Sequence, residues 1–79
     1  MKLSQYGPNQ TLLTFPNEDE VFFSYETPVA GWINGKGYWR AERKYSRTTT
    51  KHVNKYANTY RVVTLTDEQV AETLKSYGL

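Results

Sequence analysis

The feature that most limits this chain is its lack of any residue that could cross-link a small fold. It has 79 residues, no cysteine and a single histidine, His52. Disulfides, thiolate chemistry, iron–sulfur clusters and zinc sites built from cysteines or several imidazoles are therefore excluded. One domain of this size buries only about 60% of the surface of its unfolded chain. Its stability must come from large, well-packed side chains.

Aromatic residues supply those side chains. The chain has two tryptophans, seven tyrosines and three phenylalanines, which is the composition of a folded domain rather than a disordered one. One small core holds only part of these rings, so the others are expected to be half-exposed or at an interface. Little room remains for a deep substrate pocket, and we therefore do not expect an enzyme.

The segments around Asn34-Gly35 give the clearest local signal. Both residues tolerate positive φ, and β-rich segments lie on either side, at 29–33 and 37–45. This pattern predicts a hairpin. Alternation in its second strand predicts an inward face and a solvated, mostly basic face. The inward set is Trp39, Ala41, Arg43 and Tyr45, and the solvated set is Tyr38, Arg40, Glu42 and Lys44.

The secondary structure of four other segments is predicted from their composition and from the proline and glycine residues that interrupt strands. Residues 11–15 and 60–65 are β-rich, and residues 21–26 alternate with apolar side chains on both faces near their start. Thr27-Pro28 is expected to interrupt that strand. Residues 1–10 contain Gly-Pro and little periodicity, which indicates a loose lead-in with at most a short edge strand.

Two helices are predicted in the second half of the chain. Ser46 or Thr48 is the N-cap of the first, whose inward stripe is Thr49, His52, Val53, Tyr56 and Ala57. Thr66 caps the second and forms a capping box with Gln69, and Gly78 ends it. The apolar face of the second helix is Val70, Ala71, Leu74 and Tyr77.

These elements predict a single α+β domain over residues 1–79. We expect a small antiparallel β-sheet of three to five strands with two short helices on one face, in the order β-β-β-β-α-β-α. No apolar run approaches the roughly 20 residues of a membrane span, and residues 1–8 lack the apolar core of a signal peptide. We expect a cytosolic domain.

Positive charge is concentrated in one third of the chain. Eight of the ten lysines and arginines lie within residues 36–61, beside several aromatic rings. Cations neutralise phosphates and rings stack on exposed bases, so this segment suits nucleic acid. The spacing of Arg47, Lys51 and Lys55 by four residues predicts one ridge on a helix. The candidate nucleic-acid or partner-binding residues are Lys36, Tyr38, Arg40, Lys44, Arg47, Lys51 and Lys55.

Two alternatives stay open for this segment. Small antiparallel sheets also carry exposed lysines and arginines that prevent edge pairing, and the acidic terminal segments could cancel the basic field. The basic and aromatic residues could instead bind a protein, which would make the chain a modulator or inhibitor of a host enzyme or defence complex. An apolar sheet face left uncovered by the helices would favour a homodimer.

The sequence contains few residues that could serve catalysis or bind a metal ion. His52 is the single candidate for a general base near neutral pH, but the hydroxyls closest in sequence are better explained as helix caps. Glu18, Asp19 and Glu20 are consecutive and match no metal-ligand spacing, so we interpret them as a solvated turn. No cofactor motif is present.

Three segments carry a family resemblance: residues 23–30 (FSYETPVA), Asn34-Gly35, and residues 44–56 (KYSRTTTKHVNKY). Over residues 21–57 the chain resembles a family of small uncharacterised proteins common in tailed bacteriophage genomes, with a SYxTPVA…NG…YSxTTxxHxNxY pattern. The resemblance implies a phage origin and action in the cytoplasm of an infected bacterium. It brings no activity, cofactor or catalytic residue.

Overall fold

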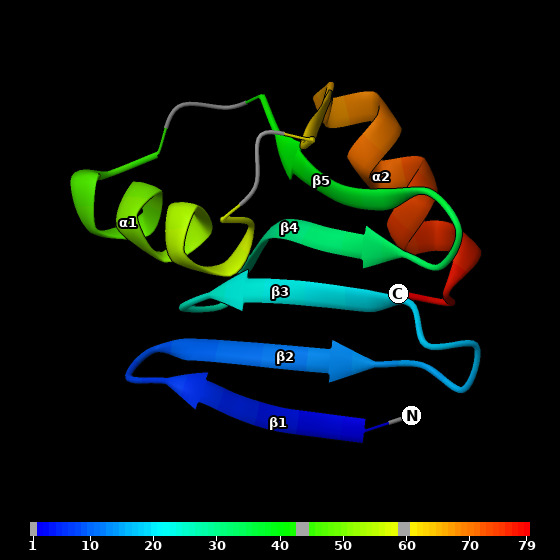
Figure 1. Cartoon of the computed structure of the whole chain (residues 1–79), viewed down its shortest axis with the longest axis horizontal. Coiled ribbons are helices and arrows are strands. Elements are labelled where there is room, and N and C mark those ends of the chain that lie inside the picture. Colours follow the sequence, from blue (N-terminus) through cyan, green and yellow to red (C-terminus); the bar gives the residue numbers. More distant parts are fainter. Residues whose placement is uncertain (1, 43–44, 59–60) are drawn as a thin grey trace.

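The computed structural model describes residues 2–42, 45–58 and 61–79, and it contains one sheet and two helices (Figure 1). The strands are β1 (Lys2–Gly7), β2 (Gln10–Thr14), β3 (Glu20–Ser24), β4 (Thr27–Ile33), β5 (Gly37–Ala41) and β6 (Val63–Leu65). The helices are α1 (Arg47–Tyr56), between β5 and β6, and α2 (Asp67–Ser76), after β6. The six strands lie side by side in sequence order.

The sheet is antiparallel from β1 to β5, and β5 and β6 are parallel. Short turns can join the antiparallel neighbours, whereas a parallel pair needs a long crossover. Helix α1 lies in that crossover. The predicted turn at Asn34-Gly35 is confirmed, because Gly35 has φ +86° and the Lys36 N–H donates to the Ile33 carbonyl at 2.9 Å.

Both predicted helix starts are confirmed. The Ser46 hydroxyl accepts from the Thr49 N–H at the start of α1, and the buried residues of this helix are Thr49, Val53 and Tyr56. Thr66 and Gln69 form the expected capping box at the start of α2, and Gly78 takes φ +82° just after it ends. These signals are local hydrogen bonds and dihedral preferences, which explains why the sequence reveals them.

The α+β class and the mostly antiparallel sheet are confirmed, but the helices do not share one face. Val53 and Tyr56 of α1 pack with Phe22 and Ala30, whereas Val70 of α2 packs with Trp39 and Ala41. Ala30 pairs with Arg40, the residue between Trp39 and Ala41. Because side chains alternate along a strand, Ala30 and Trp39 point to opposite faces. The prediction of two helices on one face is therefore wrong.

The number of strands also differs from the prediction. Within the described residues six strands are present rather than three to five, and five of them precede α1. Thr27-Pro28 does not break the sheet: β4 begins there, and a shift of register between Phe22 and Phe23 accommodates Pro28. Residues 2–7 form the edge strand that the sequence left open for this segment, and it spans most of the expected lead-in. Tyr60, the predicted first residue of the last strand, lies outside the described residues.

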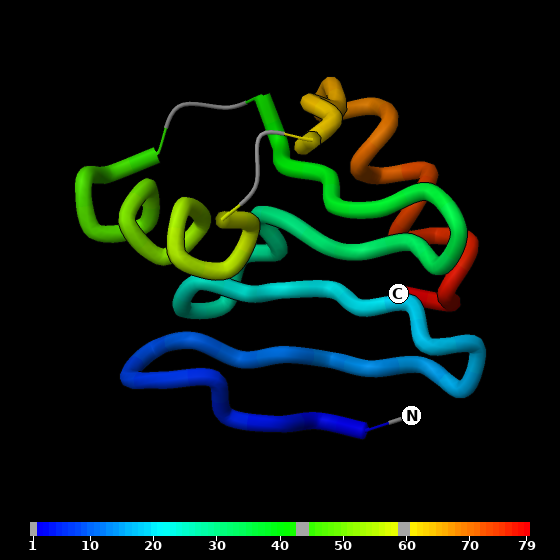
Figure 2. Tube along the Cα trace, in the orientation of Figure 1, coloured from blue at the N-terminus to red at the C-terminus, as the bar shows by residue number. Residues whose placement is uncertain are grey.

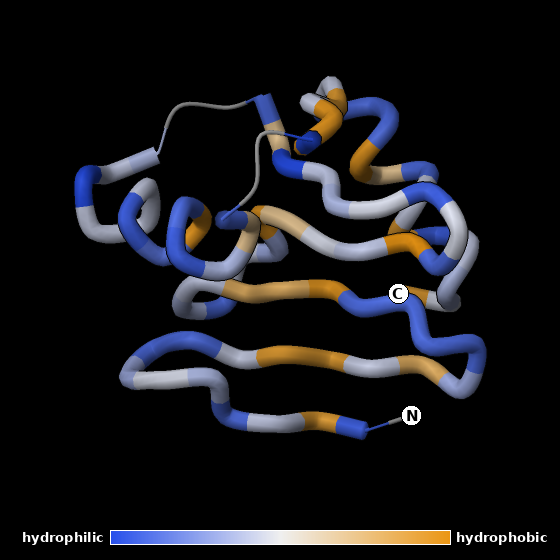
Figure 3. Tube along the Cα trace, viewed as in Figure 1, coloured by the Kyte–Doolittle hydropathy of each residue, from blue (hydrophilic) through white to orange (hydrophobic). Residues whose placement is uncertain are grey.

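The core has two parts, one on each face of the sheet. On the α1 face the Tyr56 ring stacks on Phe22 at 4.5 Å between centroids and meets the edges of Tyr6 and Tyr38. On the other face Trp39 is 2% exposed beneath α2. Hydrophobic positions run across the neighbouring strands β2 and β3 (Figure 3). The aromatic residues therefore form much of the core, as the composition predicts.

Neither helix of the described residues has the length and apolar character needed to cross a membrane.

Candidate functional site

Helix α1 presents a ridge of three basic residues. Arg47, Lys51 and Lys55 are exposed, whereas Thr49, Val53 and Tyr56, the residues of the opposite stripe, are buried against the sheet. At 1.5 Å rise per residue the ridge is about 12 Å long. Its members are spaced by four residues on a capped helix, so their order along the surface is fixed. We call these three residues the α1 ridge.

Arg40 lies beside the α1 ridge. It is on the same face of the sheet as α1, and its Nη1 donates to Oδ1 of Asn54 at 3.3 Å. The side chain is half-buried rather than solvated, because α1 covers this face. Arg40 therefore borders the α1 ridge and is tied to it by Asn54.

Three other predicted binding residues are not part of this surface. Lys36 lies in the β4–β5 turn and borders a depression of about 300 Å³ beside α2, on the other side of the sheet. Tyr38 is half-buried with its ring edge-on to Tyr56 at 5.4 Å, so the predicted solvated position is wrong. Lys44 lies outside the described residues.

The acidic side chains of α2 are kept apart from the α1 ridge. Asp67, Glu68 and Glu72 are on α2, which covers the opposite face of the sheet. Figure 2 shows the two helices as separate parts of the trace, with α1 near β3 and β4 and α2 beyond β5. Since the α2 carboxylates lie across the sheet from the α1 ridge, they are poorly placed to cancel its field.

The carboxylate of Asp19 forms hydrogen bonds inside the fold. Asp19 is 6% exposed and accepts hydrogen bonds from the Asn34 N–H at 2.8 Å and the Tyr77 hydroxyl at 2.6 Å. Burial raises the pKa of Asp19, but the hydrogen bonds from Tyr77 and Asn34 outweigh burial and leave the pKa below its usual value. The predicted solvated turn at 18–20 is therefore wrong for Asp19.

Glu20 acts as a hydrogen-bond acceptor for the aromatic core. The Tyr56 hydroxyl donates to its Oε1 at 2.7 Å. Burial raises the pKa of Tyr56 far above that of an exposed tyrosine, and the bond to Glu20 raises it further. Among the described residues no group of three histidine, cysteine, aspartate or glutamate side chains could hold a metal ion.

Two exposed tyrosines beside α1 were not anticipated from the sequence. Tyr6 is 39% exposed, and Nζ of Lys55 lies 6.0 Å from its ring centroid. Tyr25 is 53% exposed, and its ring centroid lies 6.1 Å from that of His52. The sequence predicts Tyr6 in a lead-in and Tyr25 within a strand. Only the folded chain brings both of them to α1.

A chain of polar groups joins β3 to α1. The Ser24 hydroxyl, on a residue 1% exposed, lies 2.8 Å from Nδ1 of His52 and 3.1 Å from the Thr49 hydroxyl. The Ser46 hydroxyl donates to Thr49 at 3.3 Å. A serine beside a histidine resembles a nucleophile and its base, but here the serine is buried rather than open to solvent. The arrangement anchors His52 and α1 to the sheet.

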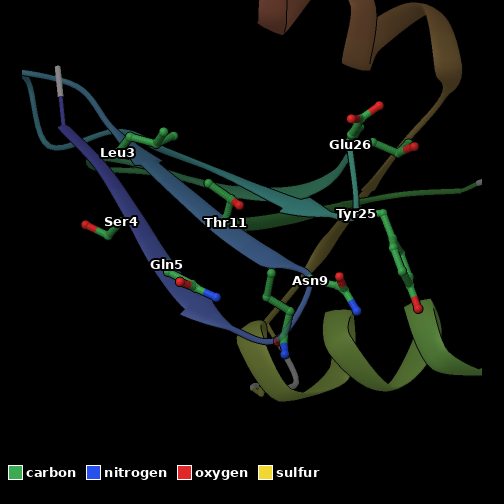
Figure 4. A pocket seen from close by; sticks show the side chains of 9 residues that line it. Leu3, Ser4, Gln5, Asn9, Thr11, Tyr25 and Glu26 are labelled. Carbon is green, nitrogen blue, oxygen red and sulfur yellow. The ribbon is translucent and has the colours of Figure 1, made fainter.

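A shallow groove lies at the outer end of the sheet. It is lined by Leu3, Ser4, Gln5, Asn9, Gln10, Thr11, Tyr25, Glu26 and Thr27. Figure 4 shows Tyr25 at one end of the groove with its ring directed towards α1, whereas Glu26 points the other way. The lining is mostly uncharged and polar, and Leu3 is 70% exposed. The groove therefore has no cluster of titratable groups for catalysis.

Comparison with known proteins gives a family but no activity. No curated protein and no solved structure matches the chain. A family model matches residues 1–73, which is nearly all of the sequence, and includes the segment around Ser24, Tyr25 and His52. The chain belongs to this family, which is described as a family of unknown function (DUF8033).

Proposed function

We propose that this protein is a non-enzymatic binding protein that contacts nucleic acid through the α1 ridge. The observation that carries the proposal is the segregation of charge. Arg47, Lys51 and Lys55 are exposed together on one face, and the carboxylates of α2 lie across the sheet. Arg40 extends the positive surface at the edge of α1. Such a surface neutralises phosphates and releases their counterions.

The number of basic residues sets the expected strength of the salt dependence. Three phosphate contacts give a slope of log K against log salt of about −2.7 on duplex DNA and about −2.1 on a single strand. Between 50 and 200 mM salt the affinity would fall about 40-fold on a duplex and about 20-fold on a single strand. The protein would therefore bind weakly at physiological salt, as an accessory factor does.

The biological setting is part of the proposal. The resemblance of residues 21–57 to small tailed-phage proteins supports an accessory or host-takeover factor acting in the cytoplasm of an infected bacterium. Binding of a host enzyme or defence complex is the alternative. It predicts that exposed rings such as Tyr25 contribute more than any one charge of the α1 ridge.

The test is a binding titration with labelled single-stranded and duplex DNA and RNA at 50 and 200 mM salt. Lys51→Glu is compared with Lys75→Glu, which makes the same change in net charge on α2. We expect Lys51→Glu to weaken binding and to reduce the magnitude of the slope by about 0.7 to 0.9. Lys75→Glu should bind nearly as the wild type does.

Two results would overturn the nucleic-acid proposal. One is a folded wild-type protein that binds none of the four probes at 50 mM salt. The other is an equal loss of affinity for Lys51→Glu and Lys75→Glu, because a general effect of net charge would then explain binding. Either result would direct the search to a protein partner.

A further inference from the structure

The backbone of Tyr25 is in an unusual conformation. Tyr25 has φ +58°, in the left-handed region where the Cβ of an L-residue crowds the following carbonyl. The neighbouring β1–β2 turn has Asn9 at φ +60°, and asparagine is a residue that tolerates this region. The Tyr25 N–H donates to the Asn9 carbonyl at 2.7 Å, so the two turns are joined. A tyrosine therefore stands where asparagine or glycine would be less strained.

The side chain that this conformation directs outward is an aromatic ring. Tyr25 is 53% exposed, and its ring lies beside His52 at 6.1 Å and a tilt of 39°. Ser24 fixes the His52 ring through its 2.8 Å contact with Nδ1. The Tyr25 ring is therefore held next to a rigid neighbour while much of its surface remains open to solvent.

The position of this ring relative to the α1 ridge is also fixed. His52 and Lys55 are three residues apart on α1 and are therefore neighbours on its surface. Figure 4 shows the Tyr25 ring directed towards α1 and the Glu26 carboxylate directed away. A partly exposed aromatic ring thus lies beside the basic surface, and the carboxylate of the next residue, Glu26, points away from it.

We propose that Tyr25 is a stacking platform for an unpaired base, so that the preferred ligand of the α1 ridge is single-stranded nucleic acid. The proposal rests on the proposed function and deepens it. Lys51 and Lys55 contact the phosphates, and the strand turns one base onto Tyr25. Duplex bases are already stacked on one another and cannot reach this ring, whereas any unpaired base has a π-face for it.

Because the backbone of Tyr25 is strained, a substitution that relieves the strain can distinguish a binding role of this residue from a structural one. If the residue served only the turn, asparagine would serve it better, since asparagine accepts positive φ with less strain. Tyr25→Asn is therefore expected to keep or raise the Tm while removing the ring. Tyr25→Phe keeps the ring and loses only the hydroxyl.

The experiment measures Tm and the affinities of both variants and of Lys51→Glu for a single-stranded oligonucleotide and for the matching duplex. Tyr25→Asn should bind the single strand about 5- to 150-fold more weakly, the range found for loss of one stacked base. Its salt slope should equal that of the wild type, because no charge is removed. Its duplex affinity and the single-strand affinity of Tyr25→Phe should stay unchanged.

The other outcomes refute the proposal in distinguishable ways. Unchanged single-strand binding by Tyr25→Asn, with weakened binding by Lys51→Glu, removes the platform and leaves the α1 ridge. A large fall in Tm for Tyr25→Asn would assign the ring a structural role and overturn the platform. Failure of the wild type to bind either probe at 50 mM salt overturns the proposed function and the platform together.

Discussion

Gly31, in the middle of β4, is predicted to be the glycine least able to accept a side chain. A Cβ added there would lie 2.5 Å from both Cε2 and Nε1 of Trp39 and 2.6 Å from the Glu20 carbonyl oxygen. Optimal contacts between non-bonded carbon atoms are about 3.5–4.0 Å, so each overlap is about 1 Å. The carbonyl belongs to the neighbouring strand and the indole is buried, so neither can move away easily.

Gly31→Ala is therefore expected at the upper end of the usual cost of overpacking, about 3 kcal/mol. For a domain of this length such a loss lowers the Tm by about 12–24 °C. Urea titration followed by circular dichroism measures the free energy of unfolding. Gly35→Ala is the matched control: no atom lies within 4 Å of its added Cβ, so only the strain at φ +86° remains, about 1–2 kcal/mol.

A second variant tests the named contact. Trp39→Phe removes Nε1, so the cost of Gly31→Ala should be at least about 1 kcal/mol smaller in that background, a coupling typical of residues in contact. The reasoning is wrong if Gly31→Ala costs no more than Gly35→Ala. It is also wrong if its cost is the same with Trp39 and with phenylalanine at that position.

Three further predictions concern buried polar contacts. Ser24→Ala should lower the free energy of unfolding by about 1–3 kcal/mol in a urea titration, because the buried Thr49 and the half-buried His52 on α1 both lose a polar contact. Tyr77→Phe should lower stability at pH 7 and flatten its acid dependence. The lowered pKa of Asp19 stabilises the fold above the pKa of the unfolded carboxyl, and this contribution is lost as pH falls through the folded pKa. Tyr56→Phe should reduce the loss of stability that begins above about pH 10. The raised pKa of Tyr56 stabilises the fold only until the tyrosine of the unfolded chain ionises. If circular dichroism shows the same alkaline loss of stability in the wild type and in Tyr56→Phe, the prediction is wrong.

The sequence predicts the local parts of this fold well. The turn at Asn34-Gly35, the cap at Ser46 and the capping box at Thr66 each depend on residues within four positions of one another. The inward position of Trp39 is also confirmed, because strand alternation identifies it. For the candidate site, the same local reasoning places Arg47, Lys51 and Lys55 on one exposed ridge of α1.

Two of the missed features depend on contacts with a neighbouring strand or helix rather than on the residue's own strand. Pro28 suggested a strand break, but a bulge opposite β3 accommodates it, and bulges depend on the partner strand. Tyr38 was expected on a solvated face because nothing in its own strand indicates that α1 covers it. One feature of the sequence did indicate that both faces of the sheet are covered. Val21 and Phe22 are adjacent in β3 and so point to opposite faces, and both are apolar and fully buried.

The sequence alone determined most of the strands and both helices, the position of the helix caps and of the turn at Asn34-Gly35, and the concentration of positive charge within residues 36–61. Those properties come from dihedral preferences, short-range hydrogen bonds and periodicity. The tertiary structure decided that α1 and α2 cover opposite faces, which separates the basic ridge from the acidic helix. It also brought Tyr25 and Ser24 to His52, across more than 25 residues of chain. The physical reason is that each helix packs its apolar side on an exposed apolar face of the sheet. Such a face forms only after strands from distant parts of the chain have paired.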